Sequence, residues 1–362
     1  MFVELHLIQN FAPSCLNRDD TNTPKDCEFG GYRRARVSSQ CLKRSVRRYF
    51  NGKAGDLGIE GLLAQRTKLL AKQLTDTLAE KGKDRDEAEK VVRAVIGAAD
   101  VKTDDAGKTS VLLFVGPDEF ERLTGRILDN WDDLVAASGK KSKKGLPVDL
   151  TDVLAEGTQA VDVALFGRMI AELKDLNVDA ACQVAHAIST HRVDMEMDFY
   201  TAVDDLQPRE ETGAGMMGIV EFNSSCFYRY SVLDTGQLTV NLGGDADLAR
   251  KAAQAFVEAA VHAIPTGKQN SMAAQNLPVY ARLIAREGAP RSLANAFLAP
   301  ARPSNEKDLA LTSVEALEKH AADLDRMYGA DGVKTDVAAS TYDGHGDKTV
   351  RDLIAAVGEV MG

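Results

Sequence analysis

Basic side chains are concentrated in one short segment of an otherwise acidic chain. Residues 18–53 contain ten basic and four acidic side chains, a local net charge of +6, whereas the whole chain carries −10. The ten are Arg18, Lys25, Arg33, Arg34, Arg36, Lys43, Arg44, Arg47, Arg48 and Lys53. The rest of the chain therefore carries −16, which disfavours nonspecific binding to nucleic acid or to a membrane surface. This asymmetry predicts a localised binding site for an anion.

The second half of this segment predicts an amphipathic helix that presents positive charge. Ser38 or Ser39 can cap its first turn. Its apolar stripe consists of Leu42, Val46, Tyr49 and Phe50. Its like-charged i, i+4 pairs are Lys43–Arg47 and Arg44–Arg48. Because each such pair repels by roughly 0.2–0.5 kcal/mol, a bound anion would relieve the repulsion, although a solvated basic face would have the same pattern.

Acidic and histidine side chains offer two other kinds of chemistry. Asp19, Asp20 and Asp26 lie in a segment rich in Pro, Asn and Asp, and they could hold a metal, cleave a substrate or form turns. His186 and His191 are five residues apart, whereas zinc ligands on one helical face prefer a spacing of about four. We therefore expect no catalytic residue, metal or cofactor.

Two short motifs could contact a polyanion. In "GRM" at 167–169, Arg168 could reach a phosphate, and Met169 could wedge between bases or pack in a core. The run "KKSKK" could attract a polyanion without specificity or form a solvated loop. Its basic residues are Lys140, Lys141, Lys143 and Lys144.

The composition is that of a globular protein, with 44% apolar and 27% charged residues. No apolar run approaches the ~20 residues that cross a bilayer, and "MFVELHLIQNF" lacks a signal-peptide pattern. The five cysteines form no CxxC pair and are odd in number, which favours reduced thiols. We expect a cytoplasmic protein with no membrane partner.

The periodicity predicts the order of the elements. Alternation at 2–9 predicts a half-buried strand, and 10–34 is expected to be a long loop before the basic helix. Residues 57–190 are predicted to be a mostly helical insertion, which includes a helical segment at 179–191. Two strand-like arms, 193–203 and 217–232, predict a long hairpin. A helix at 245–264, a strand at 279–286 and helices at 312–329 and 348–362, with a loop between them, complete the chain.

This order suits an α+β fold of the ferredoxin-like β-α-β-β-α-β type that carries insertions. RNA-binding RRM domains use the same kind of sheet. The aromatic signature of an ordinary RRM is absent from the sequence.

Several blocks of the sequence, in order along most of the chain, resemble one family. They are "SCLNRDD", "FGGYRRARVSSQCLKR", "ALFGRM", "AHAISTHRVD", "FYTAVDDLQ", "EFNSSCFYRY" and "NLGG". The chain resembles the CasC backbone subunits of type I-E CRISPR Cascade complexes. The resemblance implies an RRM-like palm (1–56 and 219–362), a helical fingers insertion (57–190) and a β-hairpin thumb (191–218). It also implies that several copies bind one crRNA, without catalysis, and form a helical filament.

The resemblance carries functional residues onto this sequence. The implied RNA-binding residues are Asn17, Arg18, Lys25, Ser38, Ser39, Gln40, Lys43, Arg44, Arg47, Arg168, Met169, Phe199, Thr201 and Val203. Phe199–Tyr200 stands where the family has Trp–Phe, and either ring can stack on a base. The four lysines of "KKSKK" correspond to a segment that attracts target DNA. Implied partners are crRNA, target DNA paired with it, further copies of the chain and other Cascade subunits.

Two alternatives remain open at the level of sequence. The chain could be a metal-dependent ribonuclease that uses Asp19, Asp20 or Asp26. It could also be a standalone RRM-like protein that binds cellular RNA and forms no multimers.

Overall fold

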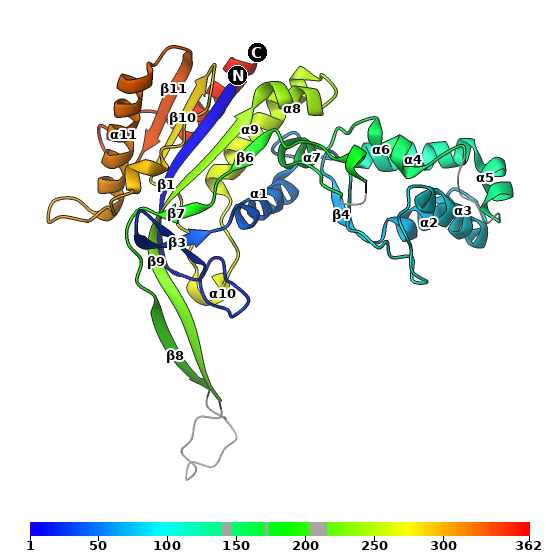
Figure 1. Ribbon diagram of the computed structural model, residues 1–362, viewed down its shortest axis with the longest axis horizontal. Helices are drawn as coiled ribbons and strands as arrows, with labels where there is room; N and C mark the ends of the chain where they lie inside the picture. Colours follow the sequence, from blue (N-terminus) through cyan, green and yellow to red (C-terminus); the bar gives the residue numbers. More distant parts are fainter. Residues whose placement is uncertain (140–145, 171–172, 203–215) are drawn as a thin grey trace, which may run out of the picture. The chain divides into compact units, whose positions relative to one another are not determined.

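The computed structural model describes residues 1–139, 146–170, 173–202 and 216–362, which form two compact units (Figure 1). Unit 1 comprises Met1–Tyr49, Val184–Val232 and Ala253–Gly362, and unit 2 comprises Phe50–Gln183 and Leu233–Ala252. Both units combine helices with antiparallel strands, which confirms the α+β class. Five of the predicted site residues lie outside the described residues: Lys140, Lys141, Lys143, Lys144 and Val203.

A sheet that has nine strands within the described residues forms the centre of unit 1. Its strands are β1 (Phe2–Ser14), β2 (Asp26–Phe29), β3 (Tyr32–Val37), β6 (Cys182–Val184), β7 (Ala187–Ser189), β8 (Glu196–Ala202), β9 (Met216–Asp234), β10 (Tyr280–Arg286) and β11 (Val333–Ser340). The spatial order is β11-β10-β1-β9-β7-β3-β2, and β6 and β8 pair with β9 beside this path. The strands pair in antiparallel fashion at β1–β10, β10–β11, β2–β3, β3–β7, β7–β9 and β8–β9.

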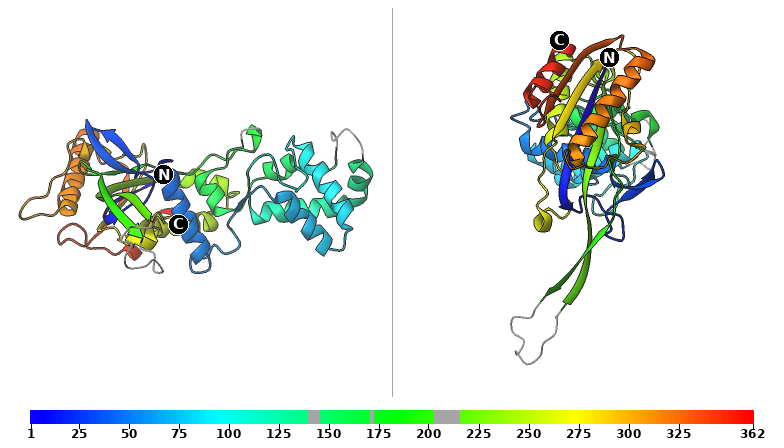
Figure 2. Two further views of the ribbon diagram at one scale, coloured as in Figure 1. Left: turned by 90° about the horizontal axis from the view of Figure 1, so that it is seen from below. Right: turned by 90° about the vertical axis from the view of Figure 1, so that its left-hand side faces the viewer.

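Helices cover both faces of this sheet. α1 (Ser39–Lys53), α9 (Ala246–His262) and α12 (Val350–Met361) lie on one face, and α11 (Leu309–Tyr328) and η2 (Ala294–Phe297) lie on the other (Figures 1 and 2). Under α1 and α9, Leu5 and Leu7 of β1 face Leu42 and Phe256. The α11 side has its own core, built from Ile8, Tyr228, Tyr280, Leu293, Phe297, Val314 and Leu317. A short helix, α10 (Gln269–Met272), follows α9.

β1 is buried on both faces, so the prediction of a half-buried strand was wrong. Its polar residues Glu4, His6 and Gln9 are as inaccessible as Leu5 and Leu7. Glu4 and His6 lie on the face that α11 covers, whereas Gln9 lies on the opposite face with Leu5 and Leu7, where its Oε1 accepts from Arg229. Burial of these polar groups requires hydrogen-bond partners.

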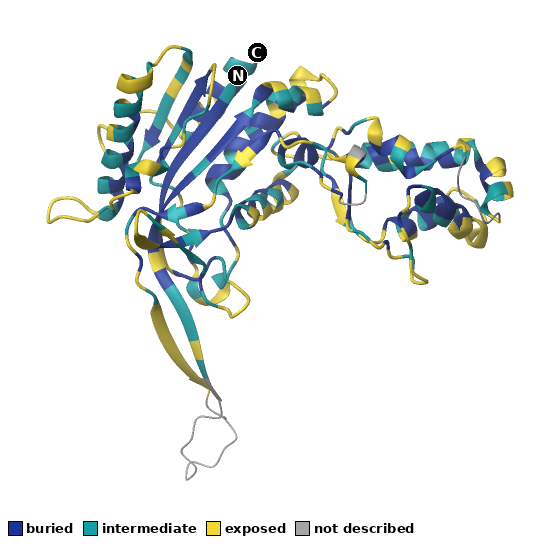
Figure 3. Cartoon of the chain, in the orientation of Figure 1, coloured by how far each residue is buried: buried dark blue, intermediate teal, exposed yellow. Residues whose placement is uncertain are grey.

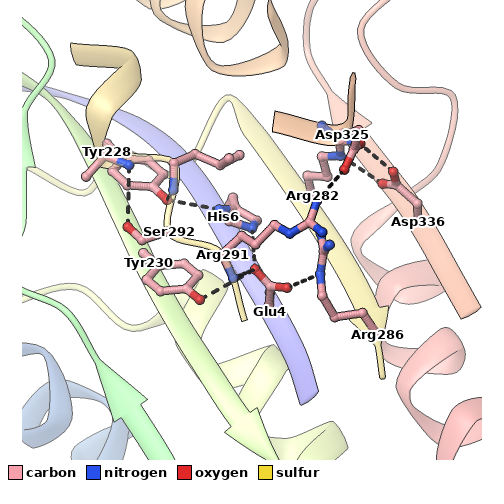
Figure 4. A network of polar contacts seen from close by, with 12 residues as sticks. Glu4, His6, Tyr228, Tyr230, Arg282, Arg286, Arg291, Ser292, Asp325 and Asp336 are labelled. Atoms are coloured by element: carbon pink, nitrogen blue, oxygen red, sulfur yellow. Dashed lines mark hydrogen bonds and ion pairs between the residues drawn. The ribbon is translucent and has the colours of Figure 1, made fainter. Parts of the chain in front are cut away.

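Those partners form a buried polar network (Figure 4). Glu4 Oε1 accepts from Arg286 Nε at 2.5 Å, and Glu4 Oε2 accepts from the Arg291 backbone N–H at 2.9 Å. His6 Nδ1 lies 2.9 Å from the Tyr228 hydroxyl, which accepts from a backbone N–H at 3.0 Å. Burial alone would raise the pKa of Glu4, but His6, Arg291 and Arg286 hold that pKa below its usual value.

The buried ring of His6 predicts a loss of stability in mild acid. Burial is the largest cause that lowers the pKa of His6. Below about pH 6.5 the unfolded chain binds a proton at this residue that the folded chain does not. The free energy of unfolding should therefore fall with pH from about 6.5 downward, by up to about 1.4 kcal/mol per pH unit. Chemical denaturation at several pH values measures this, and His6→Gln should give a shallower dependence. An unchanged dependence in that variant would assign the effect to other groups, such as the partly buried His191, whose pKa is also lowered.

Unit 2 is mostly helical. Its helices are α2 (Leu70–Glu80), α3 (Arg85–Ala98), α4 (Pro117–Asp129), α5 (Trp131–Ser138), α6 (Leu150–Ala155), α7 (Val161–Phe166), η1 (Lys174–Leu176) and α8 (Thr235–Asn241). A two-stranded sheet pairs β4 (Gln65–Thr67) with β5 (Leu113–Val115). Helices α2 to α6 share one apolar core. Asp84 caps α3 through two backbone N–H groups, and Gly116–Glu119 form the capping interaction of α4.

Three segments differ from their predicted structure. The expected loop at 10–34 contains the end of β1 and the β2–β3 hairpin, and β11 lies within the expected C-terminal loop. Residues 179–191, predicted to be helical, form β6 and β7 instead. The short β7 is held between β3 and β9, so pairing with distant strands outweighs the local preference of an Ala-rich segment for helix.

Candidate nucleic-acid interface

The N-terminus of α1 has a turn geometry that suits an anion. Ser38 is its cap residue, because the Ser38 hydroxyl accepts from the Cys41 backbone N–H at 3.3 Å. Asn17 Oδ1 accepts from the Ser38 backbone N–H at 2.8 Å and fixes this turn. Within the described residues, the backbone N–H groups of Ser39 and Gln40 have no acceptor. Such N–H groups, together with the positive end of the helix dipole, favour a phosphate.

The segment before β2 lies against this turn. The Lys25 backbone N–H donates to the Asn17 carbonyl at 2.9 Å, and the Arg36 N–H donates to the Lys25 carbonyl at 2.9 Å. Arg18 donates to Asn22 Oδ1 at 3.0 Å. The structure therefore brings Asn17, Lys25 and Ser38 together, although they are far apart in the sequence.

The basic residues of α1 lie along the part of the helix that faces away from the core. Leu42, Val46 and Phe50 are buried, as the predicted stripe requires, whereas Arg44 and Arg48 are exposed. Lys43 and Arg47 are partly exposed. The first turn contains no acidic residue to neutralise the helix dipole. A row of cations thus continues from the free N–H groups of the first turn.

Two basic residues of the 18–53 segment do not belong to this surface. Arg34 is fully buried, and its guanidinium donates to the carbonyls of Phe297 and Ser189 at 2.6 and 3.1 Å. Arg33 forms an ion pair with Asp26. Net charge alone could not separate these structural cations from those of the surface.

Sequence reasoning missed two residues next to α1. Arg36 Nε donates to the Asp26 carbonyl at 3.0 Å, and Arg36 Nη1 lies 3.1 Å from His186 Nδ1. His186 directly precedes β7, which pairs with β3. The sequence favoured a packed or hydrogen-bonded His186 over a metal ligand, but it did not predict β7, which places His186 beside Arg36. Recognition of residues 187–189 as a strand that pairs with β3 would have placed His186 near Arg36.

β8 is exposed along its length (Figure 3), and several residues of the β8–β9 hairpin that are exposed are apolar. Phe199 lies opposite Ile219, and Met197 and Thr201 are on the same face because side chains alternate along a strand. The exposed fractions are 69% for Phe199, 60% for Met197 and 59% for Ile219. An aromatic and aliphatic surface of this kind suits contact with a base or another protein. Tyr200 lies on the opposite face, directly over Gly218.

In unit 2, the two residues of the "GRM" motif that could contact a polyanion differ in exposure: Arg168 is buried and Met169 is exposed. Gly167, with φ +79°, makes a turn in which a Cβ would lie 2.8 Å from the Val178 carbonyl. After this turn Met169 is 85% exposed at the edge of a cleft of about 570 Å³. The cleft also contains Arg66 and Phe114, with the Arg66 guanidinium 4.7 Å from the ring centroid.

Arg168 is a structural residue, which corrects its assignment as a phosphate contact. Its side chain is 1% exposed and pairs with the buried Glu119 at 2.6 Å. It also donates to the carbonyls of Leu176, Phe114 and Leu154. Burial raises the pKa of Glu119, and the charge of Arg168 only partly offsets that rise.

Two of the three acidic loop residues, Asp19 and Asp26, have structural partners, and that of Asp26 is Arg33. Asp19 Oδ1 accepts from the Thr21 hydroxyl and from the backbone N–H groups of Thr21 and Thr23. Within the described residues, no three His, Cys, Asp or Glu side chains are grouped so that they could hold a metal ion. Within the same residues, no helix is both long and apolar enough to cross a membrane.

Nearly the whole chain is similar to known proteins, both in a family profile and in solved structures. A solved chain described as "CRISPR RNA-guided surveillance complex, pre-nicking" is similar, with 32% sequence identity and a TM-score of 0.86. A second, described as "CRISPR RNA-guided surveillance complex", has 28% sequence identity and a TM-score of 0.77. Each alignment covers 99% of this chain and 100% of the other. No curated protein sequence matches. The profile of the family described as "CT1975-like protein" matches residues 3–357, and the chain therefore belongs to the CT1975-like protein family.

Proposed function

We propose that this protein is a non-catalytic backbone subunit of a CRISPR RNA-guided surveillance complex and that it binds crRNA through the α1 surface of unit 1. The full-length similarity to chains of such complexes supports the class of protein. The observation that carries the proposal is the α1 N-terminus, where Asn17 and Ser38 fix a turn with two free backbone N–H groups beside Lys25.

This surface suits a guide whose sequence varies. Backbone N–H groups and the charges of Lys43, Arg44 and Arg47 can bind phosphate oxygens without reading any base. Sequence recognition is then left to base pairing between guide and target DNA. The acidic remainder of the chain disfavours binding of other nucleic acid.

The finer assignment is to the CasC subunits of type I-E Cascade. In it, the sheet of unit 1 serves as an RRM-like palm, unit 2 as the fingers and the β8–β9 hairpin as the thumb. Several copies line one crRNA as a filament, and the exposed face with Phe199 and Thr201 lies against a nucleotide displaced from the stack. Met169, exposed on unit 2, contacts the guide as well. Target DNA and other Cascade subunits are the remaining partners.

Mass measurement with RNAs of increasing length tests this proposal. The purified chain should form complexes whose mass rises in steps with RNA length, and the RNA should stay intact in the presence of magnesium. A variant in which a short linker replaces residues 195–217 should still bind RNA but should not form the stepwise multimers.

Two outcomes would contradict the proposal. RNA cleavage that is lost in Asp20→Ala would favour a ribonuclease. A single protein bound to RNA of any length would favour a standalone RNA-binding protein.

A further inference from the structure

Arg36 holds His186 in one defined orientation beside α1. The Arg36 guanidinium is fixed at Nε by the Asp26 carbonyl at 3.0 Å, and its Nη1 lies 3.1 Å from His186 Nδ1. The backbone of Arg36 is anchored too, because its N–H donates to the Lys25 carbonyl. β3 pairs with β7 at Arg36–Ile188 and Val37–Ala187, so His186, the residue before β7, lies next to the end of the strand that leads into α1.

This contact sets the tautomer of His186. A guanidinium can only donate hydrogen bonds, so Nδ1 must be the acceptor. The neutral imidazole then carries its hydrogen on Nε2, the ring atom on the far side from Arg36. Partial desolvation by the neighbouring residues, together with the charges of Arg36 and Lys25, lowers the pKa of His186. The ring is therefore neutral near pH 7 and remains a donor at Nε2.

The charged groups around His186 are cationic. Arg36 reaches it from β3, and Lys25 acts on it from the segment before β2. The carboxylate of Asp26 is engaged by Arg33 and does not neutralise them. His186 is exposed, so its donor is accessible to a ligand. An anion next to these three residues would meet two positive charges and one directed N–H.

We propose that His186, oriented by Arg36, donates its Nε2–H to a phosphate oxygen of the bound RNA and, with Lys25, forms a phosphate subsite beside the first turn of α1. This subsite rests on the proposed RNA-binding function and adds to it a neutral, sequence-independent donor. A neutral donor binds phosphate without taking up a proton. Its contribution is therefore the same at every pH at which Arg36 keeps Nδ1 as the acceptor.

Binding of one single-stranded RNA to the full chain and three variants tests the subsite. His186→Ala should weaken affinity by about 10-fold or more, the effect expected for one hydrogen bond to a charged group. His186→Gln, which keeps an outward amide N–H, should recover most of that loss. His320→Ala, a histidine on α11, should leave affinity unchanged. The ratio of wild-type to His186→Ala affinity should be constant between about pH 7 and about pH 8, where the imidazole is neutral.

The outcomes are distinguishable. Equal affinity of wild type and His186→Ala would overturn the subsite while leaving the proposed function in place. A ratio that grows as the pH falls would show that the imidazole binds as a cation, which overturns the neutral-donor assignment. Failure of the wild-type chain to bind RNA would overturn both the subsite and the proposed function. A long-range ¹H–¹⁵N spectrum of the free protein should show His186 protonated at Nε2 alone, and protonation at Nδ1 would also overturn the inference.

Discussion

Reversal of two charges on α1, Lys43→Glu with Arg44→Glu, should weaken RNA binding by about 100-fold or more at moderate salt. Each substitution removes a cation from the exposed part of the helix and places a carboxylate near the phosphates. For a single strand, loss of two phosphate contacts should reduce the slope of log affinity against log salt by about 1.4. Fluorescence anisotropy at several salt concentrations measures both quantities. The loss should be nearly equal for RNAs of different sequence, because the lost contacts are to phosphate.

A matched control tests whether position, rather than net charge, matters. Lys348 and Arg351 are exposed and lie at the start of α12 in the same unit. Their reversal to Glu changes the net charge of the chain by the same amount and should affect affinity only slightly. If both double variants lost affinity equally, the α1 surface would not be the binding site.

Substitution Arg168→Ala should destabilise unit 2 without involving RNA. It leaves Glu119 as a buried carboxylate without its ion-pair partner and leaves three backbone carbonyls without their donor. Removal of one partner from a buried pair destabilises a protein by about 3–5 kcal/mol. Chemical denaturation measures this loss directly.

The exposed pair Arg126–Glu156 provides the comparison. It lies in the same unit and is about 40% exposed on both partners, so Arg126→Ala should change stability by less than about 1 kcal/mol. If Arg168→Ala kept full stability but lost RNA affinity, Arg168 would return to the list of phosphate contacts.

Local sequence patterns predicted the elements that depend on neighbouring residues. The apolar stripe and Ser38 cap of α1 and the long hairpin of β8 and β9 all follow from periodicity or turn chemistry. β7 could not be predicted in this way, because its three residues are strand only through pairing with β3 and β9. β11 was missed for the same reason, since it is defined by its pairing with β10.

The candidate site, like the fold, has features that local sequence indicates and features that depend on residues distant in the sequence. Residue type and charge indicated an anion surface around Lys25, Ser38 and Lys43, and the structure places Lys25 beside the start of α1. Charge could not reveal that Arg34 and Arg168 are buried, because an arginine in a core has the same sequence signature as one on a surface. His186 lies beside Arg36 only because of the pairing of β3 with β7, which the sequence does not reveal.

The open edge of β8 in the β8–β9 ribbon bears on whether copies of the protein aggregate through their strands. Within the described residues, β8 pairs with β9 alone, so its other edge leaves main-chain donors and acceptors open to a further strand. All seven residues of β8 are exposed, and Glu196 and Asp198 place negative charge along it. Their repulsion opposes sheet-like aggregation between newly made copies. The negative charge of β8 therefore disfavours edge-to-edge pairing between copies of this ribbon.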